Sequence, residues 1–578
     1  MKALFRTISL IVMIVFLFIP RQSFASSDTL VVLSNISQTL DQVITADQSS
    51  STPHSVYELT ETDVSYLLDA TVNIANSVTI LGIPSETGQR PVVQSDVLSS
   101  GAITGIQWEF TGFQTKVVLQ GLYLLGVAPN GLVNTSAGQG VQVAADSVDL
   151  IVNQCVFDDF TQFDIATNAK WDKFLITNSE FRNGVEGDGQ YYIPESLRSL
   201  GVPCDTVIFN FNTFLGVAEG PVLANVFVPY FEFNHNTMVD GCKGPVWTEQ
   251  MTNAVVENNI FYNQFAVSDN EGEYYGKWNY LGPGGPRVAA VFDYAPVDSQ
   301  NAVYAGFTFT GPDTGAAAAA VEASRKITVK NNVFFNSADL LTLYASINDT
   351  TAVVGTNAYA DSIFVPEFMN TETAAMFANT AAYPNLVQSR NVVGADPGFG
   401  ASIKAMDAGA TGDGVGLLAW ISAIRTSTAT TQYFAYQRSS GSALPKFPTP
   451  EFTSGDLIYT ATFTTTDGLK MGDPYWFTGT QTGVKTITNV PHTYSLSQNY
   501  PNPFNPSTVI NFSLEKPSNV TLSIYNVLGQ KVASVVNSFM QAGSYTYQFD
   551  ASKLASGVYI YRIEAGTFVS AKKMILMK

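Results

Sequence analysis

A repeat of about 24 residues in the middle of the chain constrains the fold more than any other sequence feature. Seven segments align on one large apolar anchor residue, and the sequence intervals between successive anchors are 33, 24, 33, 24, 23 and 73. The intervals of 33 fit the same unit with a loop added, and the interval of 73 fits about three units or fewer units with a long insertion. The anchors are Leu124, Phe157, Phe181, Phe214, Met238, Phe261 and Phe334.

Residue types also recur at fixed distances from each anchor. The positions seven and five residues before it are apolar in all seven segments, and the position two residues after it is always Gly, Asn or Asp. Positions two apart share one face of a strand, whereas Gly, Asn and Asp tolerate left-handed turn conformations. The sequence therefore predicts coils of a parallel β-helix, whose like side chains stack about 4.8 Å apart. Helical repeats would show apolar spacings of three and four residues instead.

The position six residues before the anchor should face outward, yet it is apolar in five of the seven segments. An outward face is normally polar. Either the added loops cover this row or it is a contact surface. The row comprises Val118, Ile151, Leu175, Ile208, Glu232, Val255 and Thr328.

The phrases "VENNIFYN" and "VKNNVFFN" resemble the right-handed parallel β-helix of the pectate-lyase-like superfamily. We assign residues 28–400 to this β-helix. Residues 401–490 are interpreted as its cap and a linker, in which "GLKMGDPYWFTG" resembles a closing segment of secreted β-helix proteins. The stretch "TETAAMFANT" is expected to form a short helix that covers one end of the coils.

The stretch "SQNYPNPFNPST" separates this repeat from a C-terminal region with a different period. Its prolines remove backbone donors and fix a rigid turn, and the alternating strands that follow predict a small Ig-like β-sandwich over 491–578. The phrases "YNVLGQKV" and "SGVYIYRI" and the terminal Lys572, Lys573 and Lys578 resemble the C-terminal sorting domain of type IX (Por) secretion. That resemblance implies recognition by the type IX secretion machinery, removal during export, and a final place at the cell surface or outside the cell. A sandwich appended for binding is the alternative.

Residues 1–25 are expected to be a secretory signal peptide. Two basic residues precede an apolar run from Ile8 to Ile19, and small residues follow at Ser23 and Ala25. The run falls short of the about 20 residues that a membrane anchor needs, so the mature chain is expected to have no transmembrane span. The net charge of −19 argues against a nucleic-acid partner. Three cysteines, Cys155, Cys204 and Cys242, allow at most one internal disulfide.

A catalytic set is only weakly indicated. Polysaccharide lyases of the superfamily need a base and a cation that stabilises the resulting anion. The nearest candidates are Asp240, Lys243 and Glu249 in "MVDGCKGPVWTEQ", although Asp240 occupies the turn column. Asp158 and Asp159 form a carboxylate pair, but Asp159 is also a turn residue. No cofactor or metal site is predicted, although calcium held by acidic residues would suit a lyase.

Aromatic residues offer a candidate platform for sugar rings. Trp247 lies next to the weak catalytic candidates, and Tyr274, Tyr275, Trp278 and Tyr280 lie in one Gly-rich loop. They could equally pack onto the apolar outer row. The sequence therefore predicts an exported surface protein that binds or displays, with polysaccharide as a candidate ligand. A polysaccharide lyase or glycoside hydrolase acting outside the cell is the alternative.

Overall fold

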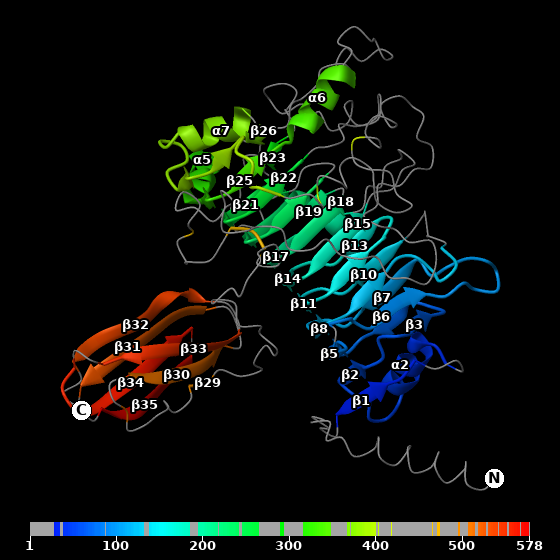
Figure 1. Cartoon of the computed structure of the whole chain (residues 1–578), viewed down its shortest axis with the longest axis horizontal. Helices are drawn as coiled ribbons and strands as arrows, with labels where there is room; N and C mark the ends of the chain where they lie inside the picture. The colour runs from blue at the N-terminus through cyan, green and yellow to red at the C-terminus, as the bar shows by residue number, and fades with distance from the viewer. Residues whose placement is uncertain are drawn as a thin grey trace. The chain divides into compact units, whose positions relative to one another are not determined.

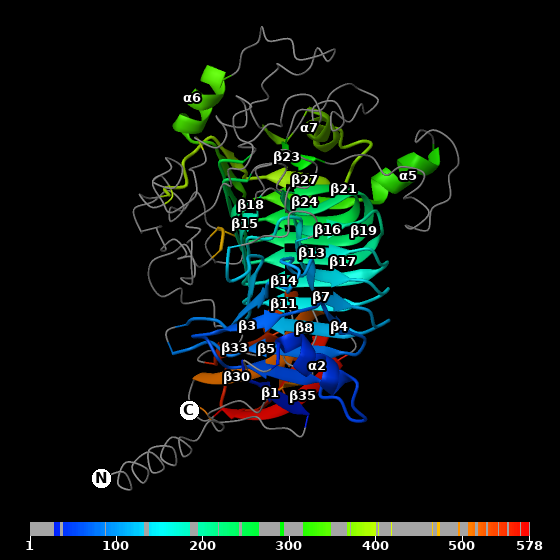
Figure 2. The same cartoon turned by 90° about the vertical axis from the view of Figure 1, so that its right-hand side faces the viewer.

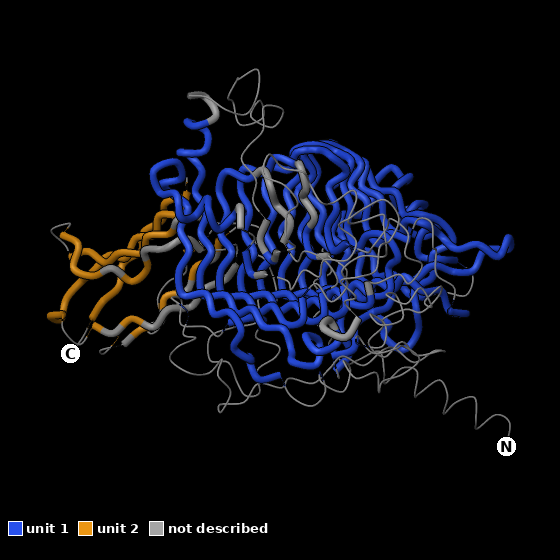
Figure 3. Tube along the Cα trace, turned by 90° about the horizontal axis from the view of Figure 1, so that it is seen from above, with its two compact units in different colours: residues 1–480 blue, residues 481–578 orange. Residues whose placement is uncertain are grey.

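The computed structural model divides into two compact units, Met1–Thr480 and Gln481–Lys578 (Figure 3). The structure describes residues 28–34, 38–86, 88–131, 138–184, 195–217, 219–241, 246–264, 290–293, 316–347, 367–369, 371–399, 403, 418, 465, 471–473, 495–496, 504, 507–514, 518–526, 530–540, 543–551, 554–566 and 568–576. The predicted signal peptide therefore lies outside the described residues.

The first unit is a parallel β-helix, as predicted, built from three ladders of stacked strands (Figures 1 and 2). The first ladder contains β1 (Thr29–Val32), β2 (Val56–Leu59), β5 (Val78–Gly82), β8 (Lys116–Gln120), β11 (Asp149–Asn153), β14 (Asp172–Thr177), β17 (Cys204–Asn210), β24 (Lys326–Lys330) and β27 (Leu386–Ser389). The second ladder contains β3 (Ser65–Leu68), β6 (Val92–Ser95), β9 (Tyr123–Leu125), β12 (Val156–Asp158), β15 (Glu180–Gly184), β18 (Thr213–Val217), β20 (Thr237–Val239), β22 (Ile260–Tyr262), β25 (Val333–Phe335) and β28 (Val392–Val393).

The third ladder closes each coil. It contains β4 (Val72–Ile74), β7 (Ile106–Phe110), β10 (Gln139–Val143), β13 (Phe163–Thr167), β16 (Glu195–Ser199), β23 (Ala290–Asp293) and β26 (Glu367–Met369). Two long strands, β19 (Glu219–Asn234) and β21 (Val246–Glu257), run through both the third and the first ladder. These two strands join the first and third ladders into one eighteen-stranded sheet, while the second ladder is a separate ten-stranded sheet.

The seven anchors stack in one register along the second ladder, as the repeat predicted. The Phe157 and Phe181 rings lie 5.1 Å apart between centroids, and the Phe181 and Phe214 rings 5.0 Å apart. Phe261 pairs directly with Phe334. The longest interval in the repeat is therefore one coil with a long insertion and not three coils.

The outer row six residues before the anchor is partly covered. Ile208 and Glu232 are only 3% and 5% exposed, and the other five residues are half-buried. None of the seven side chains is fully exposed.

The bends between ladders depend on polar residues that stack from coil to coil. Asp159, Asn183, Gly216, Asp240 and Asn263, in the column two residues after the anchor, all have φ between 51° and 59°. A second bend lies before the anchor. There, the asparagines of the column two residues before the anchor stack from coil to coil as a ladder on the core side. Each amide there donates to a main-chain carbonyl and accepts from the previous coil, as Asn236 does with Phe209 and Asn212.

Short helices lie at both ends of the coils. Leu40 and Ile44 of α2 (Leu40–Gln48) and Met376 and Phe377 of α7 (Thr371–Ala378) belong to the main apolar core. The helix expected in "TETAAMFANT" is therefore present and covers the core. Two further helices, α5 (Ala316–Ser324) and α6 (Ala338–Ile347), precede β24 and follow β25 along the chain.

The second unit is a β-sandwich with its own apolar core, as predicted. Its three-stranded sheet has the order β29 (Ser495–Leu496), β30 (Ser507–Leu514), β33 (Gly543–Asp550). Its four-stranded sheet has the order β32 (Lys531–Met540), β31 (Ser518–Asn526), β34 (Gly557–Ala565), β35 (Phe568–Leu576). All strand pairs within these two sheets are antiparallel. Within the described part of the chain, no helix is both long and apolar enough to cross a membrane.

Candidate functional site

Of the weak catalytic candidates, the structure describes the side chain of Asp240 alone. Asp240 is fully buried in the left-handed turn that follows β20, with φ of 57°. Its Oδ1 accepts a hydrogen bond of 3.1 Å from Asn263 Nδ2, and its backbone N–H donates to the Tyr262 carbonyl at 2.9 Å. Asp240 is therefore a turn residue that ties its coil to the next one.

The other predicted site residues lie partly or wholly outside the described residues. Trp247 and Glu249 stand on the first half of β21, where only the backbone is described. Lys243 lies in the undescribed connection between β20 and β21. The four loop aromatics, Tyr274, Tyr275, Trp278 and Tyr280, lie in the undescribed connection between β22 and β23.

These two connections nevertheless start and finish side by side. At their start, Asp240 bonds to Tyr262, the last residue of β22 in the next coil, and to Asn263, which follows it. At their finish, Trp247 pairs with Asp293 in parallel register. The segment carrying Lys243 and the segment carrying the loop aromatics therefore leave the same corner of successive coils and return to adjacent strands.

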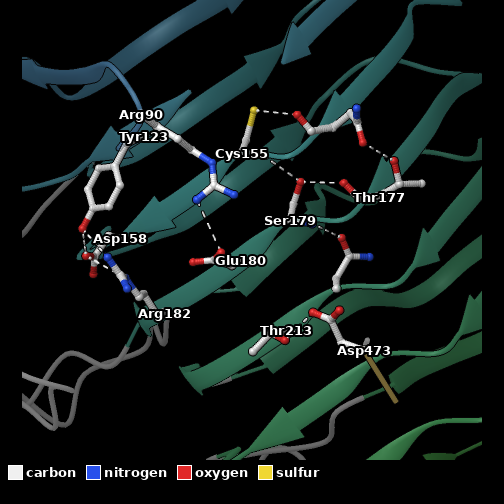
Figure 4. Close-up of polar contacts among 12 residues, drawn as sticks. Arg90, Tyr123, Cys155, Asp158, Thr177, Ser179, Glu180, Arg182, Thr213 and Asp473 are labelled. Carbon is white, nitrogen blue, oxygen red and sulfur yellow. Dashed lines mark hydrogen bonds and ion pairs between the residues drawn. The ribbon is translucent and has the colours of Figure 1, made fainter. Parts of the chain in front are cut away.

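A buried charged network, which the sequence did not single out, lies on the outer face of the second ladder (Figure 4). Residues next to the anchors face outward there because the anchors themselves face the core. Asp158 Oδ2 accepts a hydrogen bond from the Tyr123 hydroxyl and another, at 3.0 Å, from Arg182 Nε. Asp158 Oδ1 accepts a third, at 2.6 Å, from Asn183 Nδ2.

The electrostatics of this network favour one fixed charge state. Burial, and then the charge of Asp158, raises the pKa of Tyr123 well above its usual value. Burial alone would lower the pKa of Arg182, but the interactions with Asp158, Tyr123 and Glu180 together outweigh it, so the pKa of Arg182 is raised. The Arg182 guanidinium also lies 5.2 Å from the centre of the Tyr123 ring. The network therefore consists of an ion pair beside a neutral phenol.

Such a network is suited to tying coils together and not to proton transfer. Asp158 has no exposed surface, and both of its oxygens accept hydrogen bonds from neighbouring coils. Tyr123, Asp158 and Arg182 come from three successive strands, β9, β12 and β15. Arg90 adds a longer link at 3.4 Å to Glu180 on β15. A general base must lie within hydrogen-bond reach of a substrate proton, and the Asp158 carboxylate is enclosed and already engaged.

A second buried carboxyl lies on the third ladder at Asp164. It is 1% exposed, and its Oδ1 has no hydrogen-bond partner. Burial, followed by the charge of Asp158, raises its pKa well above the usual range.

Residues 471–473 lie against the second ladder, although Asp473 is 260 residues after Thr213 and 236 residues after Thr237 in sequence. The Thr213 hydroxyl donates to Asp473 Oδ2 at 2.5 Å (Figure 4). The Asp473 backbone N–H donates to the Thr237 hydroxyl at 2.8 Å. The Gly472 N–H donates to the Asn258 carbonyl. A Cβ at Gly472 would lie 2.5 Å from side chains of Thr237 and Ile260. This short segment therefore covers the outer face of β18, β20 and β22.

The cysteines and possible metal ligands add no site among the described residues. Cys155 and Cys204 are buried free thiols, and burial raises the pKa of Cys155 to about 11. Cys242 lies outside the described residues. In the part of the chain that the structure describes, no three His, Cys, Asp or Glu side chains are grouped to hold a metal ion.

Comparison with known proteins identifies the second unit. Residues 498–577 match the family described as a secretion system C-terminal sorting domain. The match spans the sandwich strands from β30 to β35. The chain therefore carries a type IX sorting domain, which marks it for export to the cell surface or the extracellular space. No curated protein matches the chain in sequence.

Proposed function

We propose that the exported β-helix binds polysaccharide at the corner where the connections after β20 and β22 leave the coils. The observation that carries this proposal is the shared root of the two connections, where Asp240 bonds to Tyr262 and Asn263. The connections return to the coils where Trp247 pairs with Asp293, and the longer one carries the four loop aromatics.

Aromatic rings suit this role because they present a flat apolar face at a low cost in conformational entropy. Polar groups of the shorter connection and of β21, such as those of Lys243 and Glu249, would orient sugar hydroxyls. The net charge of −19 repels polyanions at long range, so a neutral polysaccharide is favoured over one built from uronates. A rigid stack of coils supplies the fixed platform that such a site needs.

The test is affinity electrophoresis of the chain from Ser26 to Lys578, in gels that contain neutral or uronate polysaccharides. The double variant Trp278→Ala/Tyr280→Ala is expected to weaken retention by about tenfold or more, as for loss of an aromatic anchor. Phe113→Ala is the matched control, since Phe113 is 66% exposed and lies in the turn between β7 and β8. Equal retention of the double variant and the wild type on every polysaccharide would refute the proposal.

The alternative is a polysaccharide lyase or hydrolase that uses Asp240, Lys243 and Glu249 at the same corner. Lys243 follows Asp240 by three residues, which is the observation in favour of this alternative. Against it, the Asp240 carboxylate already accepts a hydrogen bond from Asn263 in its turn. The discriminating assay follows ultraviolet absorbance of unsaturated uronates and release of reducing sugar, with and without calcium. Product formation that Lys243→Ala abolishes would establish an enzyme. Retention without product supports a binding protein.

A further inference from the structure

The two units differ sharply in charge. The unit 481–578 contains eight Lys and Arg against three Asp and Glu, a net charge of +5. The whole chain has a net charge of −19, so the unit 1–480 carries −24. A basic sorting unit on an acidic cargo is electrostatically suited to an acidic partner, and the cargo itself would repel that partner.

One row of side chains crosses the outer face of the four-stranded sheet from edge to edge. In register, Lys531 on β32 lies opposite Tyr525 on β31, Tyr525 opposite Ile560 on β34, and Ile560 opposite Lys573 on β35. Three strand steps of about 4.8 Å place the two lysine backbones roughly 14 Å apart. The row thus has an apolar centre with a cation on each edge strand.

The outward orientation follows from the alternation along these strands. Ile524, Tyr561 and Met574, the sequence neighbours of three members of the row, are buried in the core of the sandwich. Lys531, Ile560 and Lys573 are exposed, with Ile560 41% exposed. Val558, two residues from Ile560 on the same face, is 40% exposed, and Val532, the extra residue in the register shift beside Lys531, is 36% exposed.

These apolar side chains are unusual for a small sandwich. Exposed single aliphatic residues are common, but here Val558, Ile560 and Val532 are gathered at one end of one sheet, next to Tyr525. Elsewhere on the same face, Arg562 and Glu564 form an exposed ion pair at 2.9 Å, which is an ordinary solvated surface. The cluster is therefore local to one end of the sheet.

We propose that this row, Lys531–Tyr525–Ile560–Lys573, is the surface by which the sorting domain binds the outer-membrane secretion machinery. The partner surface that fits it has an apolar strip flanked by carboxylates about 14 Å apart, so that each lysine faces an acid while Ile560 and Tyr525 are buried. The sorting domain must be read by a partner for export, and this row combines exposed apolar area with the unit's positive charge.

The proposal is tested by export of the full chain from a host with type IX secretion. Deletion of 481–578 sets the level without sorting. Ile560→Glu and the double variant Lys531→Gln/Lys573→Gln are each expected to lower surface and extracellular protein at least tenfold, with accumulation in the periplasm. Val569→Glu is the matched control, because Val569 is 53% exposed on the same sheet but pairs with Glu564, four residues along β34 from Ile560.

Folding of the variants is checked separately, so that a loss of export cannot be explained by misfolding of the sorting domain. The purified variants should keep the wild-type thermal transition and the wild-type resistance of the sandwich to trypsin. Wild-type export of Ile560→Glu, or an equal loss of export in Val569→Glu, would overturn the proposal. A sedimentation change caused by Ile560→Glu in the purified chain would overturn it too, because the face would then contact a second copy or the acidic β-helix.

Discussion

Replacing Asp158 by Asn tests whether the buried network is structural. Asp158 has no exposed surface, and the Arg182 side chain is 4% exposed, so the variant leaves a guanidinium in a site with almost no water. Removing one partner of a buried ion pair costs about 3–5 kcal/mol. The asparagine NH2 group would also face donors from Arg182 or Tyr123, so we expect about 4 kcal/mol.

The measurement is urea unfolding of the chain from Ser26 to Lys578, followed by far-ultraviolet circular dichroism. The matched control is Lys173→Gln, because the Lys173 side chain is 49% exposed and its Nζ lies 3.7 Å from Asp149 and 3.9 Å from Asp205. Exposed pairs of this kind contribute about 0–1 kcal/mol. The two variants should therefore differ several-fold in their effect on the free energy of unfolding.

The double variant Asp158→Asn/Arg182→Gln isolates the interaction between the two charges. Since the stranded cation is removed, the double variant should lose less stability than the sum of the two single variants. Polysaccharide retention should be unchanged in all three. An Asp158→Asn chain with the stability of the wild type but without ligand retention or activity would show that the network is a functional site, which would refute the reasoning.

Two further predictions concern titration and the asparagine ladder. Burial raises the pKa of Asp172 from 3.8 to about 6, so its contribution to stability is present below pH ~4 and lost as the pH rises through ~6. An asparagine at position 172 cannot titrate, so the Asp172→Asn variant does not lose this contribution. In thermal melts, the stability of the variant relative to the wild type should therefore rise by about 2–3 kcal/mol between pH 4 and 7. A difference between the two chains that stays constant with pH would contradict this. Asn236→Ala removes four hydrogen bonds from a fully buried site and should cost about 4 kcal/mol in urea unfolding, whereas a cost below about 1 kcal/mol would show that the ladder is dispensable.

The interior of the β-helix was predictable because every coil packs the same type of side chain at the same position. Phe157, Phe181 and Phe214 recur at a nearly constant spacing, and the same column is the one that stacks in the structure. The left-handed turns at Asp159 and Asp240 were predictable for the same reason. The number of coils between Phe261 and Phe334 could not be predicted from the period, because an inserted loop adds residues without adding a coil.

The charged network is hard to predict from the sequence because its members are not adjacent along the chain. The carboxylate adjacent to Asp158 in sequence, that of Asp159, belongs to a left-handed turn. Its actual partner, Arg182, lies 24 residues later at the same position of the next coil. Opposite charges at equal positions in successive coils are a signal that the sequence does contain, since such side chains stack about 4.8 Å apart.

The positions that determine the fold differ from the positions available for ligand recognition. A column that every coil shares must satisfy stacking, so its residues are constrained by the fold and carry little information about a ligand. Ligand recognition requires groups that differ between coils, and the longest interruption of the period follows Asn263, whose side chain bonds to Asp240. The sorting unit follows a parallel logic, because its inner alternation specifies the sandwich while the exposed row through Ile560 is free to specify a partner. Changes that keep the columns but alter these positions should therefore change binding or export while leaving the fold intact.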